Sequence, residues 1–374
     1  MPESYRAEYA LPIVDLEGSP RERGRAHGEA LRERIAYGLD RWSEEVAGQF
    51  DRPLAQVVQE FYSETSFTRA IQRWTPDLLE EVRGIAEGAG HSYETMLTYS
   101  LLDEWGWFAV KRYRTRVGQL GCSAIGLRRG AGGYPIASQT HDLGANWNDA
   151  LAIQRIHGAN GIRVLSLTAA GAVALSGCND RGVSINCNAL AEELPHSAAG
   201  LPVAFVIRGV LERTSLADAR QFVESVLHAS GQNYILGGPE GVCDLECSAE
   251  RVIESQAGLP VVLHTNHPIA QPDFSAATRT DHSYSRQTIL ESRRSSLRSL
   301  QDVWETLEHP GICQYYLGGS QAGIVNELSV PPRVFMTFGA PDRNPWRQIP
   351  FEKGVAPRVA RMDGAASQGE ASAC

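Results

Sequence analysis

Apolar residues recur with helical spacing over most of the first 110 positions of the chain. The segments in which they do so are 18–46, 75–90 and 92–110. The first segment opens with Ser19 as N-cap, Pro20 at the first helical position and Glu22 to close a capping box,. We therefore predict three helices, which make the first third of the chain helical.

From Cys122 onward the pattern changes to short, β-branched apolar runs separated by Gly, Asn and Asp. Such runs lie in 122–138, 162–188, 233–256, 259–267 and 321–341. They predict antiparallel strands joined by turns. Helical spacing returns in 205–227 and 285–307. Helices grouped before and between antiparallel strands predict a layered α+β fold. Because no linker rich in Pro or Ser divides the chain, we expect a single structural domain.

The charge balance disfavours several classes of partner. The formal net charge is −9, so nothing indicates a surface for nucleic acid or for anionic membranes. No uncharged apolar run is long enough to span a bilayer, and the N-terminus carries charges where a secretory signal would be apolar,. We therefore expect a cytoplasmic protein with no nucleic-acid or membrane partner.

Seven cysteines are scattered along the chain without a C-x-x-C spacing. In a reducing compartment each of them, taken alone, is best interpreted as a small buried hydrophobe. His141, Asp142, His264 and His267 are residue types that bind metals. A shared site is awkward for them, because the two last histidines would face opposite sides of a strand. We predict neither a metal nor a cofactor.

Several motifs of the chain recur, in the same order, in one family of enzymes. They are GSPRERGRAHGEAL, EEVRGIAEGAG, DEW, GCSA, SQTHD, GCNDRGVSINCNAL and HTNHP, from about Gly18 to about Gly339. In these motifs the chain resembles the acyl-coenzyme A:isopenicillin N (6-aminopenicillanic acid) acyltransferase-like family of autoproteolytic N-terminal nucleophile (Ntn) cysteine hydrolases. The resemblance implies an αββα four-layer sandwich, in which two antiparallel sheets lie between helix layers.

The resemblance also implies that the chain cuts itself where the helical pattern gives way to strands. The family's cleavage pair falls on Gly121 and Cys122. A zymogen would then yield a helical fragment 1–121 and a catalytic fragment 122–374, which stay associated. Gly121 has no Cβ, which leaves its carbonyl open to the Cys122 sulfur. The freed α-amine of Cys122, with an unperturbed pKa of about 8, can act as base toward its own thiol.

Two further catalytic residues follow from the same resemblance. Asn266, in HTNH, matches the family's Asn that helps to bind the oxyanion, and Asp142 matches an Asp that orients the site,. Thr140 and His141 replace the family's Asn and aromatic residue before this Asp. His141 is therefore a candidate for contact with substrate.

The family's Ser–Arg pair has two candidate matches after HTNH. One is SYSR, which ends at Arg286, and the other is ESRR, with Ser292 and Arg293. Both stay open as substrate-binding or orienting residues. The family's serine near the last strands has no clear counterpart in SQAGIVNEL, residues 320–328.

We therefore expect a self-processing cysteine amidohydrolase that cleaves an amide bond of a small N-acyl compound through an acyl-enzyme on Cys122. An acyltransferase that moves an acyl group from a thioester or amide donor to an amine is the first alternative. The second is an unprocessed, non-catalytic binding protein that kept the fold. The partner is a small molecule, and the sequence leaves a homo-oligomer open.

Overall fold

Two β-sheets packed face to face form the centre of the protein. The computed structural model describes residues 11–113, 121–144, 147, 149–158, 160–190, 194–271, 281–315 and 318–360. Within these residues the first sheet has the order β1 (Ile13–Leu16), β4 (Leu151–His157), β5 (Arg163–Ala169), β6 (Ser176–Asn179), β7 (Ser184–Ala189), β8 (Gln232–Gly238), β9 (Gly241–Cys247) and β10 (Val252–Ser255). The second has the order β11 (Val261–His264), β2 (Gly121–Leu127), β3 (Ile136–Asp142), β12 (Ser320–Glu327), β13 (Arg333–Phe338), β14 (Arg347–Ile349) and β15 (Arg358–Val359).

Neighbouring strands in both sheets are antiparallel, apart from β1, which pairs with β4 in parallel. Strands β2 and β3 of the second sheet pack against β7, β8 and β9 of the first. Because helices cover the outer faces, these strands are buried on both sides, and polar residues such as Asp244 and Glu246 of β9 are buried with them. The central strands thus have no face in solvent.

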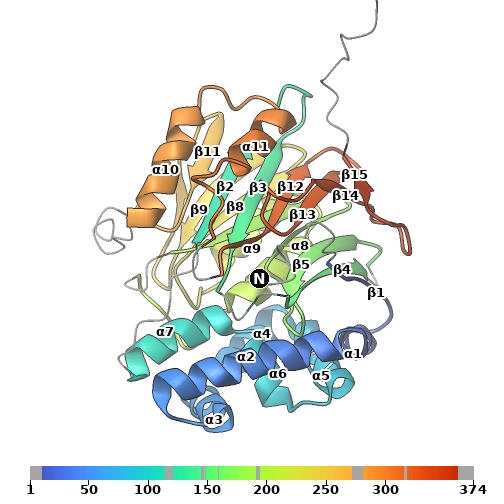
Figure 1. Cartoon of the computed structure of the whole chain (residues 1–374), viewed down its shortest axis with the longest axis vertical. Helices are drawn as coiled ribbons and strands as arrows, with labels where there is room; N and C mark the ends of the chain where they lie inside the picture. Colours follow the sequence, from blue (N-terminus) through green and yellow to red (C-terminus); the bar gives the residue numbers. More distant parts are fainter. Residues whose placement is uncertain are drawn as a thin grey trace, which may run out of the picture.

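Helices cover the outer face of each sheet (Figure 1). The helices α8 (Val203–Leu211) and α9 (Leu216–Ser225) pack on β6, β7 and β8 of the first sheet. The helices α10 (Asp281–Arg293) and α11 (Leu300–Leu307) pack on β11, β2, β3 and β12 of the second. This succession of helix, sheet, sheet and helix confirms the predicted α+β αββα sandwich.

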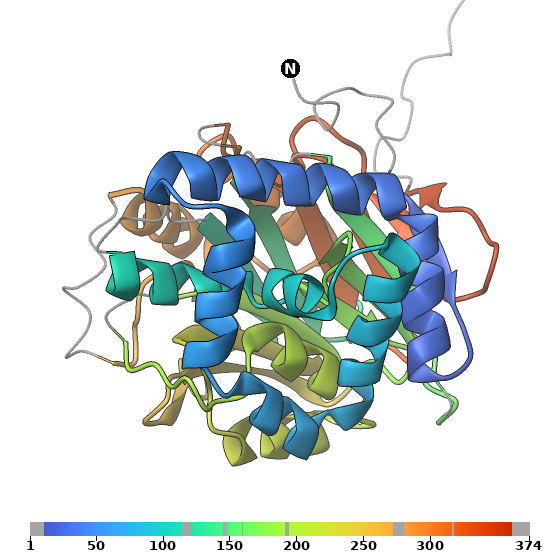
Figure 2. The same ribbon diagram turned by 90° about the horizontal axis from the view of Figure 1, so that it is seen from below.

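The N-terminal helices gather at one end of the sandwich, at the bottom of Figure 1 and facing the viewer in Figure 2. They are α1 (Pro20–Ala30), α2 (Arg32–Phe50), α3 (Leu54–Glu64), α4 (Phe67–Trp74), α5 (Pro76–Ala89), α6 (Tyr93–Tyr99) and α7 (Leu102–Tyr113). α1 begins with the predicted capping box, in which Ser19 and Glu22 bond each other's backbone N–H. α1 and α5 approach so closely that a Cβ on Gly24 would lie 1.9 Å from the Glu81 carbonyl oxygen.

Four segments predicted as single helices are each divided in two. Segment 18–46 breaks at Leu31, between α1 and α2, and segment 92–110 breaks before α7. Segments 205–227 and 285–307 break where Ser215 and Ser299 cap α9 and α11. A serine side chain that accepts a hydrogen bond from the backbone N–H three residues later caps the start of a helix. Ser215 and Ser299 therefore each begin a second helix inside a segment that apolar spacing alone predicted as one continuous helix.

None of the helices that the structure describes is both long and apolar enough to cross a bilayer.

Candidate active site

The register between β2 and β3 brings four of the predicted residues together. Gly121 and Cys122 begin β2, and their partners across the ladder are Asp142 and His141. Directly opposed residues of antiparallel strands lie about 5 Å apart, so these four residues meet at one end of the second sheet. The predicted cleavage pair is therefore adjacent to the predicted aspartate.

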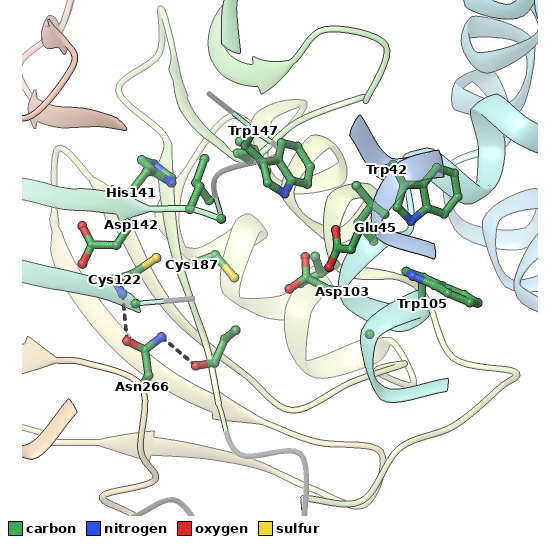
Figure 3. Close-up of a pocket in the computed structure, with 18 of the residues that line it drawn as sticks. Trp42, Glu45, Asp103, Trp105, Cys122, His141, Asp142, Trp147, Cys187 and Asn266 are labelled. Carbon is green, nitrogen blue, oxygen red and sulfur yellow. Dashed lines mark hydrogen bonds between the residues drawn. The ribbon is translucent and has the colours of Figure 1, made fainter. Parts of the chain in front are cut away.

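Asn266 reaches the same place from the other neighbour of β2. Strand β11 ends at His264, and the chain turns so that Asn266 Oδ1 accepts a hydrogen bond of 2.8 Å from the backbone N–H of Cys122 (Figure 3). Asn266 Nδ2 donates to the carbonyl oxygen of Ala189 at 2.9 Å. Its backbone N–H donates to Ser283 Oγ at 2.9 Å. Contacts to three separate segments fix this side chain beside the cysteine.

Arg286, on α10, closes the site from the outer helix layer. Its Nη1 donates to the carbonyl oxygen of Cys122 at 2.5 Å and to Ser123 Oγ at 2.9 Å. Its Nη2 donates to Asn266 Oδ1 at 2.8 Å. Because Ser283 lies one turn earlier on the same helix and holds Asn266, the structure brings this Ser–Arg pair to Cys122.

The competing pair lies elsewhere. Ser292 is exposed and donates to the carbonyl oxygen of Ile289 at 2.7 Å, and Arg293 is partly exposed at the end of α10. Neither residue lines the cavity next to Cys122. The sequence alone could not tell which of SYSR and ESRR matches the family's Ser–Arg pair. The position of each pair along α10 decides which one faces the sheet.

Asp142 is held by a serine that the sequence did not identify. Ser320, the first residue of β12, donates from Oγ to Asp142 Oδ1 at 2.5 Å. Asp142 Oδ2 is buried and has no hydrogen-bond partner among the described residues. A Cβ on Gly121 would lie 3.2 Å from this oxygen and 3.0 Å from Arg286 Nη2. The absence of a side chain at Gly121 thus keeps space open between the carboxyl group and the guanidinium.

Burial controls the charges in the site. It raises the pKa of the Cys122 thiol to about 12, the charge of Asp142 adds to this, and a hydrogen bond from Gln139 and the charge of Arg286 oppose it,. Burial also raises the pKa of Asp142 to about 6, against the effects of Arg286 and Ser320. In the uncleaved chain the thiol is therefore protonated at neutral pH, while Asp142 is ionised.

The two departures from the family pattern have structural roles in this chain. Thr140 Oγ1 accepts from the backbone N–H of Ser123 at 3.2 Å, which supports the start of β2. A hydrogen bond of 2.9 Å links His141 Nε2 to Ser176 Oγ. Burial lowers the pKa of His141 to about 4, so its ring is neutral at neutral pH. His141 lines the cavity described next.

A cavity of about 830 Å³ opens beside Cys122. Its walls combine the sandwich with the N-terminal helices, since α2 contributes Trp42 and α7 contributes Asp103 and Trp105 (Figure 3). Sequence reasoning missed Trp42 and Asp103 as lining residues. The only signal for Asp103 was its place in the DEW motif. Residues on both sides of the Gly121–Cys122 bond thus line one cavity.

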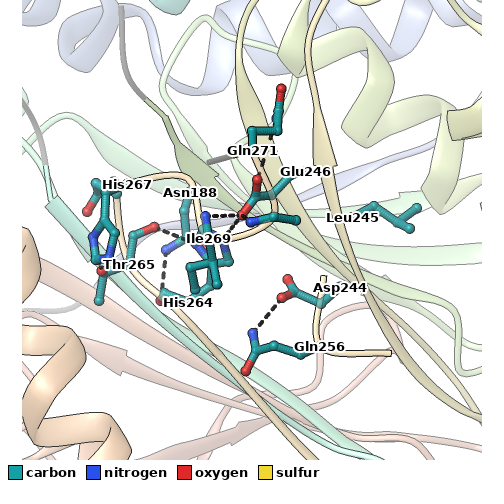
Figure 4. Close-up of polar contacts among 12 residues, drawn as sticks. Asn188, Asp244, Leu245, Glu246, Gln256, His264, Thr265, His267, Ile269 and Gln271 are labelled. Carbon is teal, nitrogen blue, oxygen red and sulfur yellow. Dashed lines mark hydrogen bonds and ion pairs between the residues drawn. The ribbon is translucent and has the colours of Figure 1, made fainter. Parts of the chain in front are cut away.

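A buried ion pair supports the turn that carries Asn266 (Figure 4). His264 Nε2 lies 3.0 Å from Glu246 Oε1, which also accepts from the backbone N–H groups of Ile269 at 2.5 Å and Ala270 at 2.9 Å. Burial lowers the pKa of His264, but the carboxylates of Asp244 and Glu246 together raise it by more than burial lowers it. The net shift of the pKa is therefore upward. Glu246 therefore ties both ends of the turn together, through His264 at one end and the N–H groups of Ile269 and Ala270 at the other.

The histidines considered as metal ligands are thus otherwise engaged. His267 stacks on Tyr284 with ring centroids 4.0 Å apart and bonds Ser283 Oγ at 2.9 Å. Among the residues that the structure describes, no group of three or more His, Cys, Asp or Glu side chains is arranged to hold a metal ion.

Comparison with known proteins finds a family model and curated relatives that match this chain. The family model described as acyl-coenzyme A:6-aminopenicillanic acid acyl-transferase matches residues 164–314. The 40 kDa form of acyl-coenzyme A:6-aminopenicillanic-acid-acyltransferase from Emericella nidulans is 25% identical over 330 residues, which cover 83% of this chain and 86% of that protein.

Several solved structures match part of this chain. An N-acylethanolamine-hydrolyzing acid amidase ortholog from Caenorhabditis elegans matches with a TM-score of 0.41 and 17% identity over 55% of this chain and 92% of its own. A mutant of conjugated bile acid hydrolase from Clostridium perfringens matches at 0.41 and 9%, over 64% and 97%. Penicillin V acylase from Agrobacterium tumefaciens matches at 0.40 and 9%, over 64% and 98%.

The αββα sandwich agrees with the four-layer fold that the resemblance implies. The family match lies in the part of the chain that runs from β5 to the segment before β12 and includes Asn266 and Arg286. The family match and the Emericella relative confirm the resemblance of this chain to the acyl-coenzyme A:6-aminopenicillanic acid acyl-transferase family.

Proposed function

We propose that this chain is a self-processing Ntn cysteine enzyme, which cleaves the amide bond of a small N-acyl compound through an acyl-enzyme on Cys122. One observation carries the proposal. Cys122 lines a cavity of about 830 Å³ while Asn266 holds its backbone N–H and Arg286 holds its carbonyl oxygen. Side chains from two distant segments, in addition to the strand ladder, thus hold the backbone of this cysteine at the cavity.

The first step is cleavage of the chain. The Cys122 sulfur bonds to the carbonyl carbon of Gly121, the Gly121–Cys122 C–N bond breaks, and the thiol proton ends on the new α-amine. Water then hydrolyses the thioester to a Gly121 carboxylate and a free thiol. Because burial raises the pKa of this thiol to about 12, the thiolate is scarce at neutral pH and the step is slow without a base,.

The second step is turnover of a substrate. The free α-amine takes the thiol proton, and the sulfur attacks the carbonyl carbon of the substrate amide. The C–N bond of the substrate breaks as the proton passes from the α-ammonium to the leaving amine, and a thioester remains on Cys122. Asn266 Oδ1 and Asp142 hold the α-ammonium. Of the two Nδ2 hydrogens of Asn266, one bonds Ala189, and the other is the donor that we assign both to the oxyanion of this step and to the oxyanion of chain cleavage,.

Acyl transfer is the second candidate, because the Emericella relative is named as an acyltransferase. Both reactions pass through the same thioester, which water or an acceptor amine can resolve. An acyl donor supplied with and without an acceptor amine separates them. A new amide product in proportion to the acceptor identifies a transferase, and free acid alone identifies a hydrolase.

Denaturing mass spectrometry tests the processing step. We expect the incubated chain to give fragments 1–121 and 122–374, and we expect Cys122→Ala to stay intact. Cys243→Ala is a matched control, because Cys243 is also buried but does not line the cavity. A wild-type chain that stays intact, or a Cys122→Ala chain that is cut at the same bond, overturns the proposal.

A further inference from the structure

We propose that Glu246 and His264 are positioning residues, whose buried contact fixes the turn 265–270 so that the side-chain amide of Asn266 faces Cys122. This inference rests on the proposed function, since it gives two further residues a part in the reaction at Cys122. Neither of them lines the cavity. They act on the reaction through the turn, which lies beside them in Figure 4.

The first argument is the place of Asn266 in the chain. Strand β11 ends at His264, which pairs with Ala124 of β2. Asn266 lies two residues beyond this end, so the strand ladder does not fix it. The direction of its side chain therefore depends on the contacts that hold the turn.

Glu246 holds the turn on both sides of Asn266. This glutamate lies on β9, in the first sheet, and is completely buried. Its Oε1 lies 3.0 Å from His264 Nε2, before Asn266 in the chain. The same oxygen accepts from the backbone N–H groups of Ile269 at 2.5 Å and Ala270 at 2.9 Å, after Asn266. One carboxylate thus holds the turn at two places.

The second argument is that His264 has an acceptor at each ring nitrogen. Nδ1 lies 2.9 Å from the carbonyl oxygen of Thr265, and Nε2 lies 3.0 Å from Glu246 Oε1. The Thr265 oxygen can only accept, and an oxygen that already accepts from two backbone N–H groups is the unprotonated oxygen of a carboxylate. A neutral imidazole has a single N–H, so only the imidazolium form of His264 donates to both oxygens.

The charges around His264 agree with this state. Burial lowers the pKa of His264, but Asp244 and Glu246, both on β9, raise it by more. Burial raises the pKa of Glu246, but the hydrogen bond and the charge of His264 lower it by more. His267, the other histidine of the turn, is neutral, since burial and the charge of His264 lower its pKa to about 4,. His264 and Glu246 therefore form an ion pair, whose charge-assisted hydrogen bond is stronger than a neutral one.

The consequence for the reaction concerns the two Nδ2 hydrogens of Asn266. One bonds the carbonyl oxygen of Ala189, on β7 of the first sheet, at 2.9 Å, and the other is the donor assigned to the oxyanion. A donor stabilises an oxyanion only when its N–H points at that oxygen. Because Glu246 lies on the same sheet as Ala189, it fixes the turn relative to this acceptor and so sets the direction of the second N–H.

Glu246→Gln tests the pair, because it keeps the shape and an acceptor oxygen but removes the charge. We expect it to slow the appearance of fragments 1–121 and 122–374 roughly tenfold. We expect it to lower kcat for an amide substrate by a similar factor and to leave KM within about twofold, because the oxyanion exists only near the transition state. In an Asn266→Ala background, Glu246→Gln should slow cleavage no further, because the residue through which it acts is already absent.

Glu327→Gln is the matched control. Glu327, the last residue of β12, is also buried and forms an ion pair, with Arg333, but it does not line the cavity. We expect this control to cleave at the wild-type rate. A wild-type rate for Glu246→Gln, or an equal tenfold loss with and without Asn266→Ala, overturns the inference. Thermal melting shows whether each variant is folded.

Nuclear magnetic resonance separates this inference from the proposed function, because it needs no turnover. The sample is the uncleaved Cys122→Ala chain with isotope-labelled histidine, in which the His264 signals are assigned by their absence from His264→Gln. We expect the His264 ring to show two N–H signals at neutral pH. We also expect the backbone N–H of position 122, which donates to Asn266 Oδ1, to exchange with deuterium at least about tenfold faster after Glu246→Gln,.

These results distinguish the two failures. If the wild-type chain neither cleaves itself nor hydrolyses an amide, but both resonance results are found, the proposed function fails and the positioning pair stands. A His264 ring with a single N–H, or an exchange rate at position 122 that Glu246→Gln leaves unchanged, overturns the positioning pair even in an active enzyme.

Discussion

Replacing Asn266 distinguishes a role in catalysis from a role in packing. Asn266 Oδ1 accepts from the Cys122 N–H and from Arg286 Nη2, both at 2.8 Å, and Nδ2 donates to the Ala189 carbonyl at 2.9 Å. Asn266→Ala removes all three bonds and leaves a charged, buried guanidinium donor without this acceptor. Asn266→Asp keeps an oxygen for Cys122 and Arg286, but it loses the Nδ2 donors.

The expected magnitudes follow from these contacts. Loss of an oxyanion donor costs about 3 kcal/mol of transition-state stabilisation, which corresponds to roughly a hundredfold or more in rate. We therefore expect both Asn266 variants to slow the appearance of fragments 1–121 and 122–374 by at least about a hundredfold. Asn266→Ala is also expected to lower the free energy of unfolding, by about 1.5–3 kcal/mol for the lost bond to a charged group. Asn266→Asp, which retains a partner for Arg286, is expected to lose less.

The assay follows the two fragments by denaturing mass spectrometry and follows unfolding by denaturant titration of the uncleaved chains. Asn344→Ala is the matched control, because Asn344 is also buried and donates to a carbonyl, that of Ala340 at 3.0 Å, away from the cavity. Cleavage of Asn266→Asp at the wild-type rate would refute the assignment of an oxyanion donor to Asn266, since this variant has no side-chain N–H.

Three further predictions concern the arginines and the thiol. Arg286→Gln should slow chain cleavage at least about tenfold, because it removes a charged donor from the Cys122 carbonyl, whereas Arg293→Gln should cleave at the wild-type rate,. Equal rates for the two variants in a gel-based time course would contradict the placement of the Ser–Arg pair at Ser283 and Arg286. Arg208→Met should lower the free energy of unfolding by about 3–5 kcal/mol, because it removes the guanidinium that donates to the buried Glu81 Oε1 at 2.7 Å,. A decrease of less than about 1 kcal/mol in chemical denaturation would contradict this prediction. Cleavage should accelerate as the pH rises from 7 to 9, because the raised pKa of Cys122 makes the thiolate fraction increase across this whole range, and a rate that falls with pH would contradict a thiolate attack,.

The helical leader was predictable from local signals, which act within a few residues. The apolar spacing of 75–90 and the capping box at Ser19 both predict helices that the structure contains. The breaks at Ser215 and Ser299 were also encoded locally, since each serine is followed three residues later by an aspartate whose N–H it accepts. Apolar periodicity alone passed over these caps, and a search for N-cap residues inside the long segments would have found them.

The sequence predicted only those residues of the candidate site that lie in one motif or on two strands that pair with each other. Gly121, Cys122 and Asp142 meet through the pairing of β2 with β3, which follows from two neighbouring strands. The contact of Ser320 with Asp142 and the presence of Asp103 in the cavity depend on how β12 and α7 pack. No short-range pattern encodes such packing. The choice between the two Ser–Arg pairs likewise needed the direction in which α10 presents its faces.

The most direct test of the account is to locate an acyl group on the processed protein. A slowly deacylating N-acyl substrate is added, the reaction is quenched in acid, and the fragments are analysed by mass spectrometry with peptide mapping. We predict that fragment 122–374 begins at Cys122, carries one acyl group on the Cys122 sulfur, and loses it on treatment with hydroxylamine. An intact chain without the adduct, or an acyl group on Cys187, which lines the same cavity, would contradict the central claim that Cys122 is an N-terminal nucleophile.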